Sequence, residues 1–270
     1  MFSIFYIKTS VLLIKIDQNL LDFSKNPELL STDNHTIIFL HDSLGCNALW
    51  RDFPKKLGMK TKCDVLSYDR QGYGGSAPFL IKHRDHDYLK NEAELLGKII
   101  NKFNLQNVIL FGHSDGGSIA LLTAALFPEK IAGIITEGAH IFVEQETING
   151  IKDAVLAYKH TNLKSKLEKY HKEKTDDVFN MWTKTWLSES YQSWNIEQYL
   201  HHIQCPSLII QGVNDEYGTQ KQVENIVNKT SGHSIPLLIP EIGHTPHKEN
   251  PTIVIKETTK FLKNNVLISQ

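Results

Sequence analysis

The chain has 270 residues, of which 41% are hydrophobic and 22% charged, and its formal net charge at pH 7 is −1. These values are typical of a globular protein with a sizeable core, and they favour one domain with an inserted subdomain over two independent domains. The near-neutral charge argues against nucleic acid or an anionic membrane as a partner. The three cysteines, Cys46, Cys63 and Cys205, are far apart and odd in number, which indicates neither a disulfide framework nor a metal site.

The chain opens with an apolar stretch that predicts two short strands, around residues 3–7 and 11–16. No basic leader precedes this stretch, and Lys8 and Lys15 interrupt it, so we expect neither a signal peptide nor a spanning helix. We therefore expect a cytoplasmic protein. Residues 17–35 are polar and rich in turn formers, which predicts a connector.

Strand-like and helix-like stretches then alternate. Short apolar runs predict strands at residues 36–40, 64–68, 108–111, 131–135, 206–210 and 235–239. An apolar stripe at helical spacing predicts a helix over residues 88–103, and a closing helix is expected over 251–264. Alternation of this kind indicates an α/β fold with a doubly wound, mostly parallel sheet.

Residues 144–202 interrupt the alternation, since they show helical periodicity, many aromatic side chains and no strand signal. A helical block inside a βα alternation predicts an inserted cap over 144–202, with the core formed by residues 1–143 and 203–270. Most of its aromatic residues are expected to form the core of the insert, whereas Trp182 and Trp186 are candidates for the substrate pocket.

The run Gly112-His113-Ser114-Asp115-Gly116-Gly117 directly follows a predicted strand and precedes a helix-like run over 118–127. A Gly-x-Ser-x-Gly turn between a strand and a helix predicts a nucleophile elbow. The small neighbours Gly112 and Gly116 permit the tight turn, and the helix N-terminus supplies N–H groups where an oxyanion would develop. Ser114 is therefore the candidate nucleophile.

A serine hydroxyl needs a base, and the base needs an orienting carboxylate. Asp215 and His244 each follow a predicted strand, at the edge of the sheet where such groups gather, and the order Ser114, Asp215, His244 is the one expected. Taken alone, Asp215 also fits a surface turn and His244 is one of 13 histidines. Glu137, which follows the strand predicted at 131–135, is the alternative acid.

Two backbone N–H groups are expected to form the oxyanion hole, that of Asp115 after the nucleophile and that of Ser43 in the loop after the strand at 36–40. The segment 83–87 resembles a metal cluster or a kinase catalytic loop, but no phosphate loop or second ligand set accompanies it. We therefore expect a solvated loop there, no bound metal and no cofactor.

With these residues considered together, the chain resembles the α/β-hydrolase superfamily over nearly its whole length. The matching motifs are His41-Asp42-Ser43-Leu44-Gly45, the loop 69–76, the Ser114 elbow, the segment 212–215, and Gly243-His244 with the segment 249–251. Asp42 departs from the family, which usually has glycine there, and this leaves the exact oxyanion donor open. Ser114 at the central elbow position argues against the haloalkane dehalogenases and epoxide hydrolases of this fold, which carry aspartate.

The Ser-Asp-Gly-Gly elbow is similar to that of valacyclovirase-like amino-ester hydrolases, in which the aspartate holds the α-amino group of the substrate. This resemblance implies that Asp115 binds substrate. The alternative is structural, because a carboxylate in the first turn of a helix is stabilised by about 0.3–1 kcal/mol. Both interpretations stay open at this point.

The sequence thus predicts a serine hydrolase that cleaves a small carboxylic ester or related acyl compound through an acyl-enzyme. Its expected partner is a small-molecule acyl substrate, and the sequence does not predict the oligomeric state. The same triad would also suit a carbon–carbon bond hydrolase, an enol-lactonase or a thioesterase. A third possibility is a non-catalytic, ligand-binding member of the fold.

Overall fold

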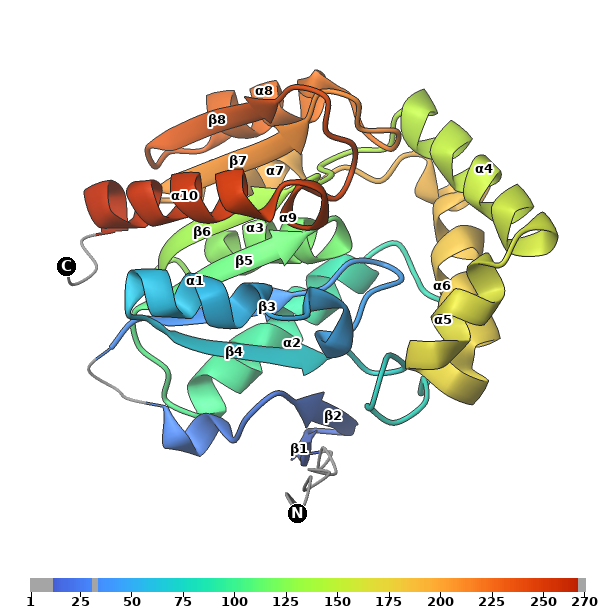
Figure 1. The fold of residues 1–270 in the computed structure, drawn as a ribbon, viewed down its shortest axis with the longest axis horizontal. Coiled ribbons are helices and arrows are strands. Elements are labelled where there is room, and N and C mark those ends of the chain that lie inside the picture. The colour runs from blue at the N-terminus through green and yellow to red at the C-terminus, as the bar shows by residue number, and fades with distance from the viewer. Residues whose placement is uncertain (1–11, 31–33, 267–270) are drawn as a thin grey trace, which may run out of the picture.

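The computed structural model describes residues 12–30 and 34–266 (Figure 1). Its described strands form one sheet in the order β1-β2-β4-β3-β5-β6-β7-β8. They are β1 (Leu12–Ile16), β2 (Asn19–Phe23), β3 (Thr36–Leu40), β4 (Asp64–Asp69), β5 (Val108–His113), β6 (Ile131–Glu137), β7 (Ser207–Gly212) and β8 (Ser234–Ile239). The pairs β1–β2 and β2–β4 are antiparallel and the others are parallel, which confirms the predicted mostly parallel sheet.

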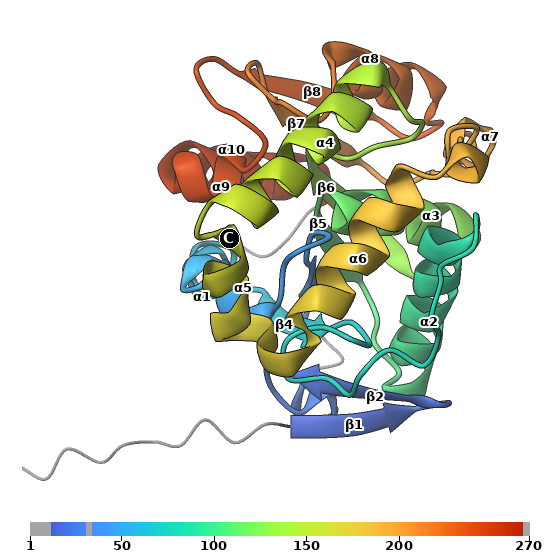
Figure 2. The same cartoon turned by 90° about the vertical axis from the view of Figure 1, so that its right-hand side faces the viewer.

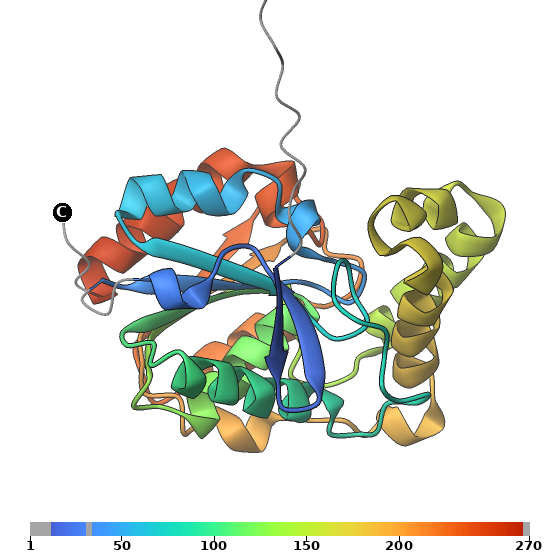
Figure 3. The ribbon, with the colours of Figure 1, turned by 90° about the horizontal axis from the view of Figure 1, so that it is seen from below.

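Helices cover both faces of the sheet because its central strands are apolar on both sides. In β3, Ile37 and Phe39 face one cluster of buried side chains while Ile38 and Leu40 face the other. The first cluster includes α1 (Phe53–Thr61) and α10 (Pro251–Phe261), and the second includes α2 (Tyr88–Lys102), α3 (Asp115–Leu126) and α8 (Gln220–Lys229). Figure 3 shows α1 and α10 on one side of the sheet and α2 and α3 on the other.

Most of the helical segment between β6 and β7 lies beyond the carboxyl ends of the parallel strands (Figures 1 and 2). It contains α4 (Gln145–His160), α5 (Leu163–His171), α6 (Thr175–Trp186) and α7 (Glu197–Leu200). The first three helices pack on one another, whereas the short α7 packs against α3 and α8. The inserted helices have the position expected of a cap, and its boundaries at residues 144 and 202 stay a prediction.

The connector predicted at residues 17–35 was wrong in part, because it contains strand β2 and a 3-10 turn, η1 (Pro27–Leu29). Leu21 and Phe23 of β2 are buried, and Phe23 pairs with Tyr68 of β4. Asn19 and Asp22 concealed this strand, because asparagine and aspartate are depleted in strands, although β2 pairs with both β1 and β4. The strand predicted at residues 3–7 lies outside the described residues.

The remaining elements are short. They are η2 (Asn47–Trp50), η3 (Lys172–Lys174), η4 (Glu189–Tyr191), α9 (Pro246–Glu249) and the π-helical turn η5 (Leu262–Val266), at which the predicted closing helix changes geometry. All three cysteines are buried and unpaired. Within residues 12–30 and 34–266, no helix is both long and apolar enough to span a bilayer.

Candidate active site

Ser114 lies between β5 and α3 with a strained backbone, at φ 54° and ψ −119°. The positive φ arises from the sharp turn in which the strand ends and the helix begins. A side chain at Gly112 would collide with the carbonyl oxygen of Gly116, and one at Gly116 with that of Leu40. This close packing accounts for both glycines of the predicted elbow and presents Ser114 at the sheet edge.

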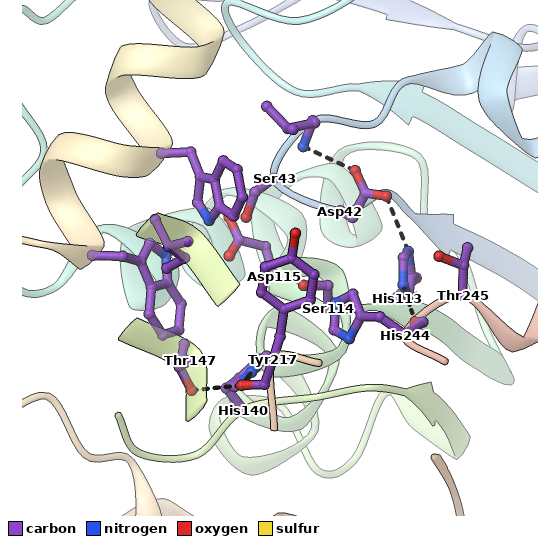
Figure 4. Close-up of a pocket in the computed structure, with 14 residues that line it drawn as sticks. Asp42, Ser43, His113, Ser114, Asp115, His140, Thr147, Tyr217, His244 and Thr245 are labelled. Carbon is purple, nitrogen blue, oxygen red and sulfur yellow. Dashed lines mark hydrogen bonds and ion pairs between the residues drawn. The ribbon is translucent and has the colours of Figure 1, made fainter. Parts of the chain in front are cut away.

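Asp215 and His244 meet at the same edge, from the loops that follow β7 and β8. His244 Nδ1 lies 2.8 Å from Asp215 Oδ1 and 3.0 Å from Oδ2, and Asp215 Oδ1 also accepts a hydrogen bond from the Tyr217 N–H at 2.9 Å. Ser114 and His244 line one pocket (Figure 4). The structure therefore brings together the three residues that the sequence predicted as a triad.

Electrostatics orient the His244 ring. Burial alone would lower the pKa of His244, but the Asp215 carboxylate and its hydrogen bond outweigh burial and raise that pKa. Conversely, the imidazole holds the pKa of Asp215 below its usual value although burial acts to raise it. With Asp215 ionised, Nδ1 carries the proton and Nε2 is left to accept one. Among the described residues no hydrogen bond joins Ser114 Oγ to Nε2, and such bonds often tighten only when substrate binds.

The two N–H groups predicted for the oxyanion hole, those of Ser43 and Asp115, have no acceptor within the described part of the chain. The N–H of Leu44, by contrast, donates to Asp42 Oδ1 at 2.9 Å. Asp42, the residue that departs from the family pattern, therefore shapes this loop through its side chain. Ser43 stays the candidate donor.

Asp42 also reaches the elbow, a role that sequence reasoning missed. Its Oδ2 lies 3.1 Å from His113 Nδ1, and His113 Nε2 lies 2.8 Å from the carbonyl oxygen of His244. Although burial acts to raise it, His113 holds the pKa of Asp42 well below its usual value. The carboxylate thus ties the oxyanion loop to the elbow and, through His113, to the His244 loop. The unusual Asp42 in the motif was the one sequence signal for this link.

The carboxylate of Asp115 already has protein partners. Its Oδ2 lies 3.5 Å from Arg70 Nη2, its Oδ1 accepts a hydrogen bond from the Tyr88 hydroxyl at 3.1 Å, and the side chain is 1% exposed. Trp186 Nε1 in turn donates to the Tyr88 hydroxyl at 2.8 Å. Arg70 Nη2 also donates to the Asp42 carbonyl oxygen at 2.9 Å. Sequence reasoning did not foresee the Arg70–Asp115 ion pair.

The pocket at Ser114 is a cavity of about 100 Å³ beneath the inserted helices. Asp115, Trp182 and Trp186, the three candidates for substrate contact, all line it. The other lining residues are Asp42, Ser43, Leu44, His113, Ser114, His140, Thr147, Ile151, Tyr217, His244 and Thr245. An apolar wall with a few convergent polar groups is typical of a small-molecule site.

Glu137, the alternative acid, makes its side-chain hydrogen bond to His247 and, among the described residues, none to His244. Its Oε2 lies 2.6 Å from His247 Nδ1, and burial raises the pKa of Glu137 to about 8. A carboxyl group that is protonated at neutral pH is poorly suited to orient an imidazolium. Among the residues that the structure describes, no group of three histidine, cysteine, aspartate or glutamate side chains could hold a metal ion.

Comparison with known proteins places this chain in a family. The family described as serine aminopeptidase S33 matches residues 56–251. The chain belongs to this family. It is therefore a hydrolase of the α/β-hydrolase superfamily, as its motifs predicted.

Relatives and solved structures agree with this assignment. "Serine hydrolase BPHL" of Mus musculus is 25% identical over 234 residues, covering 79% of this chain and 74% of that protein. "Putative esterase/lipase 2" of Mycoplasma genitalium is 27% identical over 252 residues, covering 85% and 90%. A membrane phospholipase A structure covers 96% of this chain and 87% of its own, with TM-score 0.75 and 18% identity. The α/β hydrolase MGS-M2 from a deep-sea metagenome library covers 93% and 97%, with TM-score 0.75 and 16% identity. The structural matches confirm the predicted fold.

Proposed function

We propose that this hydrolase cleaves a small carboxylic ester through an acyl-enzyme on Ser114. The observation that carries the proposal is the buried His244–Asp215 pair, which shares a pocket with a serine on a strained elbow. The relatives named as esterase/lipase and serine hydrolase support ester chemistry.

In the proposed mechanism His244 Nε2 takes the proton of Ser114 as Oγ attacks the ester carbonyl. The Asp215 carboxylate stabilises the imidazolium that forms. The N–H groups of Ser43 and Asp115 hold the oxyanion of the tetrahedral intermediate. His244 then protonates the leaving alcohol, and a water activated by the same imidazole attacks the acyl-enzyme and releases the acid.

Removal of the Ser114 hydroxyl group tests this proposal. We expect Ser114→Ala to abolish hydrolysis of nitrophenyl acetate and butyrate, and to abolish labelling by a fluorophosphonate, because both require the Ser114 alkoxide. Its circular dichroism and thermal midpoint should match the wild type, which excludes unfolding as the cause. Full esterase activity in Ser114→Ala would refute the proposal.

A second candidate is hydrolysis of α-amino esters, and the position of Asp115 on the pocket wall favours it. The elbow's similarity to valacyclovirase-like enzymes supports the same substrate class. A charge-assisted hydrogen bond to a substrate ammonium contributes about 1.5–3 kcal/mol, or roughly ten- to hundredfold in selectivity. That ammonium would compete with Arg70, the present ion-pair partner of Asp115.

A matched pair of nitrophenyl esters, one acyl and one α-aminoacyl, distinguishes the candidates. A kcat/KM ratio of about ten or more for the amino ester, lost in Asp115→Asn, would establish the amino-ester substrate class. Because both esters are measured on one preparation, the ratio is insensitive to any loss of folded protein. A ratio near one would leave a plain esterase with Asp115 in a structural role. Hydrolysis of neither ester would favour the carbon–carbon, lactone, thioester or non-catalytic alternatives.

A further inference from the structure

A histidine of the inserted helices reaches into the core beside the oxyanion loop. His171, the last residue of α5, is 0% exposed. Its Nε2 lies 2.9 Å from the carbonyl oxygen of Leu44, and its Nδ1 lies 3.1 Å from the backbone nitrogen of Gly74. One side chain from the insert therefore bridges two separate loops of the core.

The two contacts determine the tautomer of His171. The Gly74 N–H is a donor, so Nδ1 must be the unprotonated acceptor, and Nε2 then carries the hydrogen that it donates to the Leu44 carbonyl. Burial acts in the same direction by lowering the pKa of His171. The charged or titratable groups around it are Asp42, His41 and Lys174, and the ring of Tyr73 packs against it with centroids 5.9 Å apart. A neutral His171 satisfies both loops at once.

The Leu44 peptide groups are consequently held from two directions. Asp42 of the core accepts the Leu44 N–H, and His171 of the insert donates to the Leu44 carbonyl. Ser43, the candidate oxyanion donor, lies between Asp42 and Leu44 in the chain. With the Leu44 N–H and the Leu44 carbonyl both held by hydrogen bonds, the two peptide units that follow Ser43 are fixed, which limits the φ and ψ angles through which its own N–H could turn.

We propose that His171 is a positioning residue that sets the geometry of the oxyanion hole. The insert then contributes to catalysis through the backbone of the Ser43 loop as well as through the walls of the pocket. The catalytic part of this inference rests on the proposed serine hydrolase mechanism. The ordering of the loop by His171 does not.

Lys174 provides a matched control, because it ties the same insert to the core without touching the oxyanion loop. Its Nζ donates to the carbonyl oxygens of Tyr73 and Gly74, at 3.2 and 2.7 Å, and to that of Ser76. Lys174→Met therefore removes hydrogen bonds between the insert and the loop at residues 73–76. His171→Phe removes the hydrogen bond between the insert and Leu44 of the oxyanion loop. His171→Gln retains one acceptor and one donor and serves as the conservative variant.

Two measurements test the inference in the full-length protein. The first is hydrogen–deuterium exchange of the peptide that contains residues 42–46. We expect faster exchange in His171→Phe, and near wild-type exchange in Lys174→Met and His171→Gln. The second is inhibition by an alkyl boronic acid, whose tetrahedral adduct with Ser114 places an oxygen in the oxyanion hole. We expect its Ki to rise about tenfold or more in His171→Phe while KM changes less than about threefold, since the interaction is made to the transition state.

The outcomes separate this inference from the proposed function. Wild-type exchange at residues 42–46 in His171→Phe overturns the inference, whatever the activity. Equal changes of Ki in His171→Phe and Lys174→Met also overturn it, because His171 would then act only by seating the insert. A wild-type protein that neither hydrolyses esters nor reacts with a fluorophosphonate refutes the proposed function, and the exchange data then decide the role of His171 alone.

Discussion

Asp115→Asn is the substitution that best tests how this active site is built. The change removes one negative charge but keeps the shape of the side chain, and its amide oxygen can still accept the Tyr88 hydroxyl. It does remove the counter-ion of Arg70. The Arg70 side chain is 1% exposed, and its Nε and Nη1 have no hydrogen-bond partner among the described residues. The test therefore asks whether Asp115 stabilises the fold.

The expected loss follows from the ion-pair distance. Unit charges 3.5 Å apart attract by about 5 kcal/mol at an effective dielectric constant of about 20. Arg70 keeps its bond to the Asp42 carbonyl and lies near Glu92, so part of this attraction is replaced. Removing one partner of a buried pair costs about 3–5 kcal/mol. We expect the free energy of unfolding of Asp115→Asn to fall by about 3 kcal/mol.

Urea unfolding followed by tryptophan fluorescence measures this loss, with Arg70→Met and the double variant completing a cycle. We expect the double variant to be more stable than the sum of the single losses predicts, because it leaves no unpaired buried charge. A loss below about 1 kcal/mol in Asp115→Asn, or strictly additive losses, would refute the assignment of Asp115 as the counter-ion of Arg70.

Three other substitutions probe the base and the pocket. Asp215→Asn should lower kcat/KM by about 10⁴. It should also move the acid limb of the pH profile to lower pH, because the two largest contributions that raise the pKa of His244 are then lost while burial still lowers it, and an unmoved limb would contradict this. Gly138 has φ 55°, and in Gly138→Ala the added methyl group would lie 2.8 Å from the His244 ring and displace it. Steady-state kinetics should therefore show kcat/KM reduced about 100-fold. Wild-type kinetics would contradict the position of the ring. Trp182→Ala enlarges the pocket, so the ratio of kcat/KM for a hexanoate ester to that for a butyrate ester should rise about tenfold. The hexanoyl chain is longer by two methylene groups, and burial of each contributes about 0.8 kcal/mol. An unchanged ratio would place the acyl chain elsewhere.

The central sheet could be predicted from sequence because its strands carry the strongest local signal. β3 and β5 are fully buried, so every residue must be compatible with the interior and the pattern is visible without any partner. β2 was not predicted, since its burial pattern is mixed and it contains Asn19 and Asp22, which are residue types that strands usually exclude. The short helix α9 likewise left no periodic signal over four residues.

The proposed triad could be predicted because each member follows a strand within a few residues. Strand ends are local in sequence, and a parallel sheet brings them to one edge. The partners of Asp115, by contrast, come from loops and helices that the sequence does not place relative to one another. Arg70 is 45 residues away and Tyr88 is 27 residues away, so no local pattern records either contact. The same reason hides the contact between His171 and Leu44, which are 127 residues apart.

The attachment of the inserted helices has a consequence for how this protein can change over time. The chain leaves the sheet at the end of β6 and returns at the start of β7, and these strands are direct neighbours from Ile134↔Ser207 to Glu137↔Ile210. Because the two strands are parallel, the chain leaves β6 at the carboxyl edge of the sheet and enters β7 at the amino edge, and the sheet holds these two points at a fixed separation. Closing a longer loop costs only about 0.6 kcal/mol per doubling of its length. Segments of very different size can therefore be exchanged at this position while the register of the core, and with it the Ser114–Asp215–His244 geometry, is preserved.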